Sequence, residues 1–305
     1  MTRCFTTLAA ITLFSLLCSM PVTTHAQQNS PFVFKINGAG VHQSDADFSD
    51  RDGGFSMDRW FFSAGLDYGW NARTSLGISV GGGRSIYDFD ELGEFGNGIP
   101  WDTIEDFRVT ATWRFGVGET ATVMIIPTMR INGEKGASTG DSRTYGLFSA
   151  IVWRVSENLT IGPGIGVFSR LEDSTRVFPV LAIEWDISDR WNLSTGRGLA
   201  SSQGPGLTLG YKLNEDWSLG LSGRYEDTEF RLDDEGPAVG GIGRDQSIPL
   251  VFRADLKPND VLNLTFFAGL QFFGKLKLKN ALDQVVDESD YDPPLIVGAS
   301  FEFHF

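Results

Sequence analysis

The residues best suited to acid–base or nucleophilic chemistry lie in one polar stretch, GVHQSDADFSD, residues 40 to 50. His42 is followed there by Ser44, Asp45 and Asp47, residue types that can form a nucleophile and its base. Sequential neighbours in a polar loop rarely converge on one point, as such chemistry requires. His304, beside the C-terminus, is expected at the opposite end of its strand. We therefore predict no catalytic residue and no enzyme activity.

Three other patterns are similar to ligand-binding motifs, and each lacks a residue or an element that the motif requires. The aspartates at 45, 47, 50 and 52 resemble a calcium loop, but Asp50 occupies the glycine position and no glutamate closes the loop. GLQFFGKL (269 to 276) has the spacing of a phosphate loop, but Leu276 replaces the magnesium-binding Ser or Thr. GPGIGV (162 to 167) is followed by no helical pattern. We predict neither a metal nor a cofactor.

The elements that must position any site are strands. Apolar residues alternate with polar ones in residues 107 to 115, 145 to 155, 183 to 187, 250 to 256 and 295 to 305. Period-2 alternation predicts strands with one apolar and one polar or small face. After residue 27, no apolar run approaches the ~20 residues that a membrane-spanning helix needs. The fold class predicted is all-β.

The connections between these strands are of two kinds. Short turns occur at residues 71–72, 116–119, 156–158, 188–190, 214–216 and 258–260. The other connections, mostly longer, are residues 42–55, 88–103, 133–143, 171–175, 198–205, 226–245 and 276–292. Alternating short and long connections with an even strand count are typical of outer-membrane barrels. The pattern predicts about 14 antiparallel strands in up-and-down order, with both termini on the short-turn side.

Prolines leave a lower strand count open. Pro127, Pro163, Pro179 and Pro249 fall inside predicted strands, where each removes a hydrogen-bond donor. Twelve strands are therefore an alternative. The stretch from 198 to 206 also makes the ninth and tenth strands short.

Aromatic residues and charge separate the two rims. Eight aromatic residues lie within a few positions of short turns, where they predict an interfacial girdle: Trp70, Trp113, Phe115, Trp153, Trp185, Trp191, Tyr211 and Trp217. The five longest connections contain 23 acidic and 7 basic residues. Their net charge of −16 is larger in magnitude than the overall net charge of −14. The acidity therefore belongs to the long-loop rim, which disfavours nucleic acid as a partner.

The N-terminus has the pattern of a secretory signal peptide. Arg3 precedes an apolar run from Leu8 to Met20, and cleavage is expected after Ala26. Both cysteines, Cys4 and Cys18, lie in this segment. We predict export of residues 27 to 305 as one barrel domain without disulfides.

The last strand ends in FEFHF, and with the signal peptide and the loop pattern it resembles Gram-negative outer-membrane β-barrel proteins of uncharacterised barrel families. That resemblance implies that Phe301, Phe303 and Phe305 form the signal for the barrel-assembly machinery. It also implies a lipid-facing aromatic surface and residence in the bacterial outer membrane. The last strand should pair with the first, near residues 32 to 40, because a closed barrel leaves no strand edge in lipid.

The polar phase of the strands predicts the lumen. Its predicted lining consists of Arg108, Arg114, Arg130, Arg154, Glu184, Asp186, Arg224, Arg253 and Asp255. Basic residues outnumber acidic ones in this phase, so we expect a narrow porin-like channel for small solutes with a weak preference for anions. The alternative is a non-conducting structural or surface-binding barrel whose acidic loops contact the envelope or a partner.

Overall fold

The structure is a computed structural model and describes residues 31–90, 95–172, 174–195 and 205–305. The predicted signal peptide, residues 1 to 26, lies outside the described residues. Within Phe32–Phe305, which forms one compact unit, the elements are β1 (Phe32–Asp47), β2 (Gly54–Asn71), β3 (Thr74–Phe89), the 3-10 turn η1 (Phe95–Asn97), β4 (Thr103–Val117), β5 (Ala121–Glu134), β6 (Arg143–Ser156), β7 (Leu159–Ser169), β8 (Thr175–Asp186), β9 (Trp191–Thr195), β10 (Gly206–Lys212), β11 (Trp217–Arg224), β12 (Glu226–Arg231), β13 (Ile242–Leu256), β14 (Leu262–Lys279), β15 (Val285–Tyr291) and β16 (Leu295–His304).

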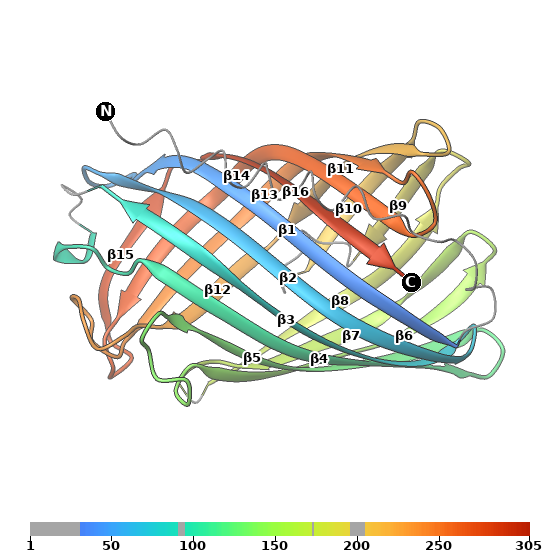
Figure 1. The fold of residues 1–305 in the computed structure, drawn as a ribbon, viewed down its shortest axis with the longest axis horizontal. Coiled ribbons are helices and arrows are strands. Elements are labelled where there is room, and N and C mark those ends of the chain that lie inside the picture. The colour runs from blue at the N-terminus through green and yellow to red at the C-terminus, as the bar shows by residue number, and fades with distance from the viewer. Residues whose placement is uncertain (1–30, 91–94, 173, 196–204) are drawn as a thin grey trace. The chain divides into compact units, whose positions relative to one another are not determined.

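These strands form a closed antiparallel wall (Figure 1). Each strand from β1 to β11 pairs with its sequence neighbour, and β11–β13–β14–β16–β1 completes the ring. Of the 16 strands in the described part of the chain, only β12 and β15 stand outside this ring, so the barrel has 14 wall strands. The predicted fold class and strand count are confirmed.

The closing pair is the one expected from the sequence. β16 runs antiparallel to β1, from Lys35↔His304 to Gln43↔Ile296, and Phe34 and Phe305 exchange two backbone hydrogen bonds. The four prolines in question all lie within the paired strands β5, β7, β8 and β13, so twelve strands is wrong. The ninth and tenth strands are short, as predicted, with 5 and 7 residues.

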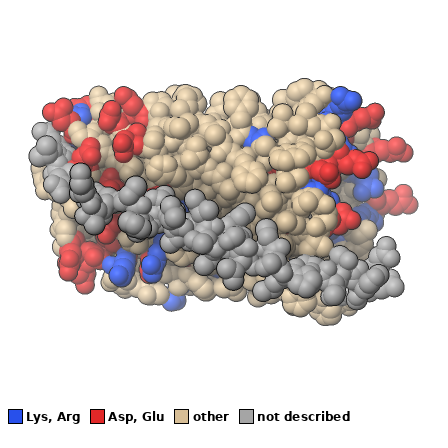
Figure 2. Space-filling view, turned by 45° about the horizontal axis from the view of Figure 1, so that its top comes forward, with Lys and Arg blue, Asp and Glu red and all other residues tan. Residues whose placement is uncertain are grey.

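The outer face of the wall is apolar. Large side chains point outward along successive strands, for example Phe34 in β1, Ile78 in β3 and Phe252 in β13, which are 53%, 56% and 73% exposed. In the view of Figure 2, most charged side chains gather at the two ends, with a broad uncharged band between them. An apolar band of this kind requires lipid to cover it. No helix in the described part of the chain is long and apolar enough to cross a membrane.

The short-turn rim carries the expected aromatic girdle. The six tryptophans predicted there are all exposed: Trp70, Trp113, Trp153, Trp185, Trp191 and Trp217. Several form pairs with a neighbouring ring, such as Tyr68 with Trp70 and Trp191 with Tyr211, each at 4.8 Å between centroids.

At the other end, part of the wall folds into the barrel. β12 continues β11 in the same register against β13, and β15 and β16 likewise share one register against β14. β12 then bridges to β5 through Arg231↔Gly133. Five wall strands, β6 to β10, separate β11 from β5. β12 therefore cannot contact β5 along the wall, and it reaches β5 by crossing the barrel interior.

We call this segment the inward sheet: β12, residues 242–247 of β13, residues 274–279 of β14, and β15. The register slips where it leaves the wall, between Gln246 and Ile248 in β13. In β14, Phe273 at the same level has a φ of 54°. Bulges of this kind bend strands and turn them away from their sheet. Pro293 and Pro294 separate β15 from β16, and both strands pair with β14.

The inward sheet corrects three predicted connections. Residues 226–245 and 276–292 were expected to be loops, yet they contain β12, β15 and parts of β13 and β14. β1 extends to Asp47, so the predicted loop 42–55 shrinks to residues 48–53. Several acidic residues of these segments form ion pairs within the inward sheet, such as Asp227 with Arg244 and Glu288 with Lys275. The predicted connection 198–205 lies almost entirely outside the described residues.

Candidate functional site

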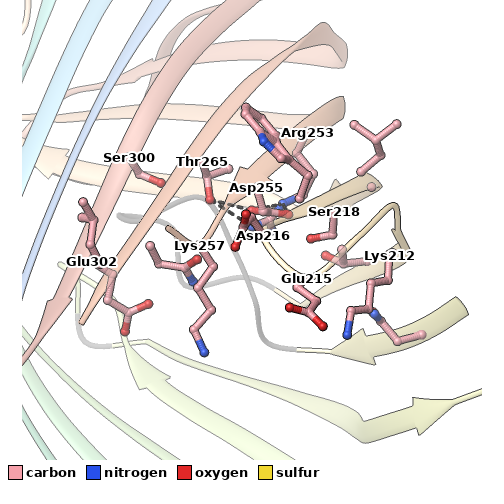
Figure 3. Close-up of a pocket in the computed structure, with 18 of the residues that line it drawn as sticks. Lys212, Glu215, Asp216, Ser218, Arg253, Asp255, Lys257, Thr265, Ser300 and Glu302 are labelled. Carbon is pink, nitrogen blue, oxygen red and sulfur yellow. Dashed lines mark hydrogen bonds and ion pairs between the residues drawn. The ribbon is translucent and has the colours of Figure 1, made fainter. Parts of the chain in front are cut away.

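The lumen at the short-turn end is a polar cavity of about 780 Å³ (Figure 3). It is lined by side chains from β9, β10, β11, β13, β14 and β16. Strand alternation places Asn192, Ser194, Thr208, Ser218 and Ser300 on this surface, together with charged residues. We call this cavity the vestibule. Its hydroxyl, amide and charged groups are the kind that water solvates.

One ion pair in the vestibule wall is tightly held. Arg253 donates to Asp255 from Nε at 3.2 and 3.1 Å and from a terminal nitrogen at 2.5 Å. The Thr265 hydroxyl donates to the same carboxylate at 2.6 Å (Figure 3). Because Asp255 neutralises Arg253 locally, this arginine adds no net charge to the lumen.

The vestibule lining as described is not basic. Five carboxylates face three Lys or Arg side chains; the acids are Glu215, Asp216, Asp255, Asp260 and Glu302, and the bases are Lys212, Arg253 and Lys257. His304 accompanies Glu302 at 2.8 Å. The excess of bases that suggested anion preference is therefore not found at this end.

The long-loop end is sealed by a buried core. Fifteen buried apolar residues form one cluster. One side comes from β1 to β4 and the connections 48–53 and 95–102, and the other side from the inward sheet and the connection between β12 and β13: Ala46, Phe48, Phe55, Met57, Tyr87, Phe89, Phe95, Trp101, Ile104, Phe230, Leu232, Ala238, Leu276, Leu278 and Tyr291. The Trp101 ring meets Phe230 edge-on at 5.1 Å. Close-packed aromatic cores leave little room for water.

A buried polar knot fixes the inward sheet to the wall. Asp245 of β13 is 5% exposed and accepts hydrogen bonds from the hydroxyls of Tyr87 and Tyr291, at 3.0 and 2.9 Å. Gln271 donates to the Tyr291 hydroxyl at 2.7 Å. A buried carboxylate needs such donors. These directional hydrogen bonds therefore hold the inward sheet in one position against the wall, which apolar packing alone would not do.

The opposite face of the inward sheet is charged. Arg244 donates to both oxygens of Asp227 at 2.8 and 2.7 Å. On the wall, Arg176 of β8 pairs with Asp227, and Arg170, directly after β7, pairs with Glu229. Farther along, Lys275 donates to Glu288 at 2.8 Å. This charged face continues the face that meets lipid below the bulges.

The connection 48–53 clasps the outer edge of β15, and we call it the latch. Arg51 donates to both oxygens of Asp287 at 2.9 and 2.8 Å, and the amide of Gly96 donates to the same carboxylate at 2.8 Å. The Ser289 hydroxyl donates to Asp50. Hydrogen bonds from Arg51 and then from Ser289 hold the pKa of Asp50 below its usual value, since both favour the carboxylate form.

The residues predicted to line the lumen divide into two groups. Arg108, Arg130, Arg224, Arg253 and Asp255 are buried or nearly so and lie against the interior. Arg114, Arg154, Glu184 and Asp186 are exposed and lie near the short turns. Arg130 and Arg108 share Asp106, with Arg108 also over the Phe61 ring at 5.3 Å.

Phe301 and Phe303 form an edge-to-face pair at 5.6 Å, and Phe305 stacks on Phe303 at 6.1 Å. His42 lies in β1 rather than in a loop, where its Nδ1 meets the Asp58 carboxylate of β2 at 2.8 Å. The described residues contain no group of three or more His, Cys, Asp or Glu side chains placed to hold a metal.

Sequence reasoning missed the residues that seal the barrel. Phe230, Leu276 and Asp245 were assigned to loops or left without a role. One signal could have found them. β14 contains 18 residues, far more than the roughly ten that cross a bilayer. The phase shift itself is visible only in the structure, where the bulge at Phe273 turns Lys275 and Lys277 to the outer side.

No protein-family model matches the chain, and no curated protein matches it. Among solved structures it is similar to an outer membrane channel from Pseudomonas putida, with a TM-score of 0.49 and 11% identity over 94% of this chain and 99% of that chain. It is also similar to a Pseudomonas aeruginosa FadL homologue (TM-score 0.45, 13% identity, 90% and 93% covered) and to the NanC porin (0.39, 9%, 88% and 98%). The chain has the fold of an outer-membrane β-barrel.

Proposed function

We propose that the protein is a channel for small polar solutes in the bacterial outer membrane, reached after signal-peptide export, and that the inward sheet holds it closed. One observation carries this proposal. The barrel interior is a wide polar vestibule at the short-turn end and a dry aromatic core at the other. One side of this core is the inward sheet, which is a continuation of wall strands. In the proposed open state, the inward sheet moves away from the core and opens the lumen.

The wall below the inward sheet supports a water-filled path. Small hydroxyl side chains face the interior in cross-strand pairs, such as Thr110 with Thr128 at 3.4 Å and Thr208 with Ser222 at 2.9 Å. Barrels of eight strands are filled by side chains and those of sixteen leave an aqueous channel. Fourteen strands with small inward residues give a narrow path.

The conductance of the refolded mature protein in a planar lipid bilayer tests the proposal. A closed channel gives long silent periods interrupted by discrete current steps. Brief openings are expected because conformational states separated by a few kcal/mol interconvert. Continuous silence from protein that is shown by heat-modifiable gel mobility to be folded and inserted would contradict the proposal.

The anion preference stays a prediction with a test of its own. It depends on the inward arginines, but Arg253 is neutralised by Asp255 and the vestibule lining is slightly acidic. Reversing Arg108 and Arg253 together to glutamate should move the reversal potential in a salt gradient toward cations. An unchanged reversal potential would exclude these residues from ion selection.

The core itself favours a second candidate, a non-conducting barrel. Fifteen buried apolar residues pack together at the long-loop end. In that case the acidic long-loop rim would contact the envelope or a partner. Silence of the wild type and of variants with a weakened inward sheet would favour this function over the channel.

Assembly is proposed to follow the resemblance of the last strand. Phe301, Phe303 and Phe305 would be read by the barrel-assembly machinery, and membrane lipid would then cover the apolar belt. Replacing Phe305 with alanine should lower the amount of assembled barrel in cells. Refolding of the purified variant into detergent should be unchanged, because that step does not use the machinery.

A further inference from the structure

A second cavity, of about 170 Å³, lies between the charged face of the inward sheet and the inner face of β6 to β8. On the wall side it is lined by Phe168, Phe178, Arg170 and Arg176, and on the sheet side by Asp227 and Glu229. An engineered apolar cavity of about 150 Å³ in another protein binds benzene. The volume therefore suits one small ring or a short acyl chain.

The floor of this cavity is apolar and flat. The rings of Phe168 and Phe178 stack with 5.6 Å between their centroids and an interplanar angle of 5°. Each ring covers a glycine of the neighbouring strand, Gly146 for Phe168 and Gly166 for Phe178. A Cβ at either glycine would lie 2.3 or 2.5 Å from the ring. The glycines therefore allow both rings to lie flat against the wall.

The arginines beside this floor are accessible, whereas their partners are not. The Arg170 and Arg176 side chains are 27% and 31% exposed, against 12% for Glu229 and 4% for Asp227. Guanidinium groups next to an aromatic floor are suited to a carboxylate attached to an apolar body. The carboxylates of the inward sheet occupy the positions that such a solute would take.

If a solute carboxylate took Arg170 and Arg176, then Asp227 and Glu229 of the inward sheet would still have a cationic partner. Arg244 lies on the inward sheet itself and contacts both Asp227, at 2.7 Å, and Glu229, at 3.5 Å. An uncompensated buried charge costs several kcal/mol. Because Arg244 remains with the sheet, a solute can take the wall arginines without that penalty.

We propose that this cavity binds small monocarboxylates with an apolar body, and that the bound carboxylate takes Arg170 and Arg176 from Glu229 and Asp227. This inference rests on the proposed channel function and gives it a solute class. Binding separates β12 from two of its wall contacts. The hydrogen bond from Asn132 to the backbone oxygen of Glu229, at 2.6 Å, remains there. The solute thereby favours the open arrangement of the inward sheet.

Calorimetric titration of the refolded protein in detergent with benzoate tests the site. Benzyl alcohol has the same ring without the charge, and acetate has the charge without the ring. Benzoate should bind at least tenfold more tightly than either. Arg170→Gln combined with Arg176→Gln should weaken benzoate about tenfold or more, since both charge-assisted contacts are lost. Arg84→Gln is the matched control, because Arg84 pairs with Glu105 away from this cavity.

Equal binding of benzoate and benzyl alcohol, or unchanged benzoate affinity in the double variant, would overturn the site. Single-channel recording with benzoate then separates the two proposals. If benzoate binds through the two arginines and raises the open probability, both stand. If it binds and every variant stays silent, the channel function fails and the site stands. If the channel conducts and benzoate neither binds nor changes the current, the site fails alone.

Discussion

The two ends of the barrel interior differ although β13 and β14 contribute to both. At the short-turn end the inward phase of β13 and β14 presents Arg253, Asp255 and Thr265 to a polar cavity. Beyond the bulges the same phase presents Asp245, Leu276 and Leu278 to a dry core. The outer phase changes in the opposite direction, from Phe252 and Phe266 to arginine and lysine. Within one strand, the residues on a given face are therefore polar or apolar according to whether that face contacts water, lipid or the protein core.

The difference shows how a barrel can be closed without a separate plug domain. The wall strands are longer than the membrane requires, and bulges bend the surplus inward. β12 and β15 keep the registers of β11 and β16, so most of the surplus retains strand pairing outside the local register slips. The latch and the polar knot then determine how firmly the surplus stays inside.

The largest effect is expected from Phe230→Ala. Phe230 is fully buried against Trp101, and loss of such a ring costs about 3–5 kcal/mol. The free energy of unfolding in urea should fall by that amount, and the open probability should rise. Ser218→Ala in the vestibule is the control, with an expected change below about 0.5 kcal/mol. Equal effects of the two changes would mean that the two ends are not energetically distinct.

A smaller effect is expected from Arg51→Gln, which opens the latch. The bidentate bond to Asp287 is partly buried, with both side chains 17% exposed. Hydrogen bonds between charged groups contribute about 1.5–3 kcal/mol, so the open probability should rise at least several-fold. Arg84→Gln removes an exposed ion pair and should change it little. A latch variant with wild-type opening would show that β15 is held by the core alone.

The smallest effect concerns pH. The lowered pKa of Asp50 means that its contribution to the latch is complete above about pH 4, the range of an unfolded aspartate. That contribution is lost as the pH falls through the lowered pKa. Asp50→Asn should therefore open more often than the wild type at about pH 7, and the two should converge once the pH falls below the lowered pKa of Asp50. A difference that persists at low pH would assign the effect to something other than this carboxylate.

Much of the fold could be predicted because alternation and turn length report directly on a barrel. The six short turns, the pairing of the first and last strands and the short strands β9 and β10 all follow from local patterns. The prolines misled only the alternative count, since pairing is interrupted locally beside Pro127 and Pro163 and the strands continue past each gap.

The site could be predicted only in part, because alternation is the same in a wall strand and in a folded-in strand. Lys275, Leu276, Lys277 and Leu278 read equally well as either. Only contact between distant segments, such as Phe230 with Trp101, distinguishes the two. Strand alternation predicted that Arg108 and Arg253 point inward. The structure was needed to identify Asp106 and Asp255 as the carboxylates that pair with them.

The central claim is that the inward sheet closes a channel, and a reversible lock tests it most directly. The side chains of Asp50 and Ser289 are in contact, so Asp50→Cys with Ser289→Cys brings two thiols within reach of a disulfide. Cys4 and Cys18, the other cysteines, lie in the predicted signal peptide. Thr110→Cys with Thr128→Cys places a matched disulfide in the wall, below the inward sheet.

Single-channel recording of the oxidised lock should show no openings, and addition of a reducing agent should restore the wild-type steps. The wall control should conduct in both states. Equal conductance of the lock before and after reduction would contradict the claim that the inward sheet is the closure.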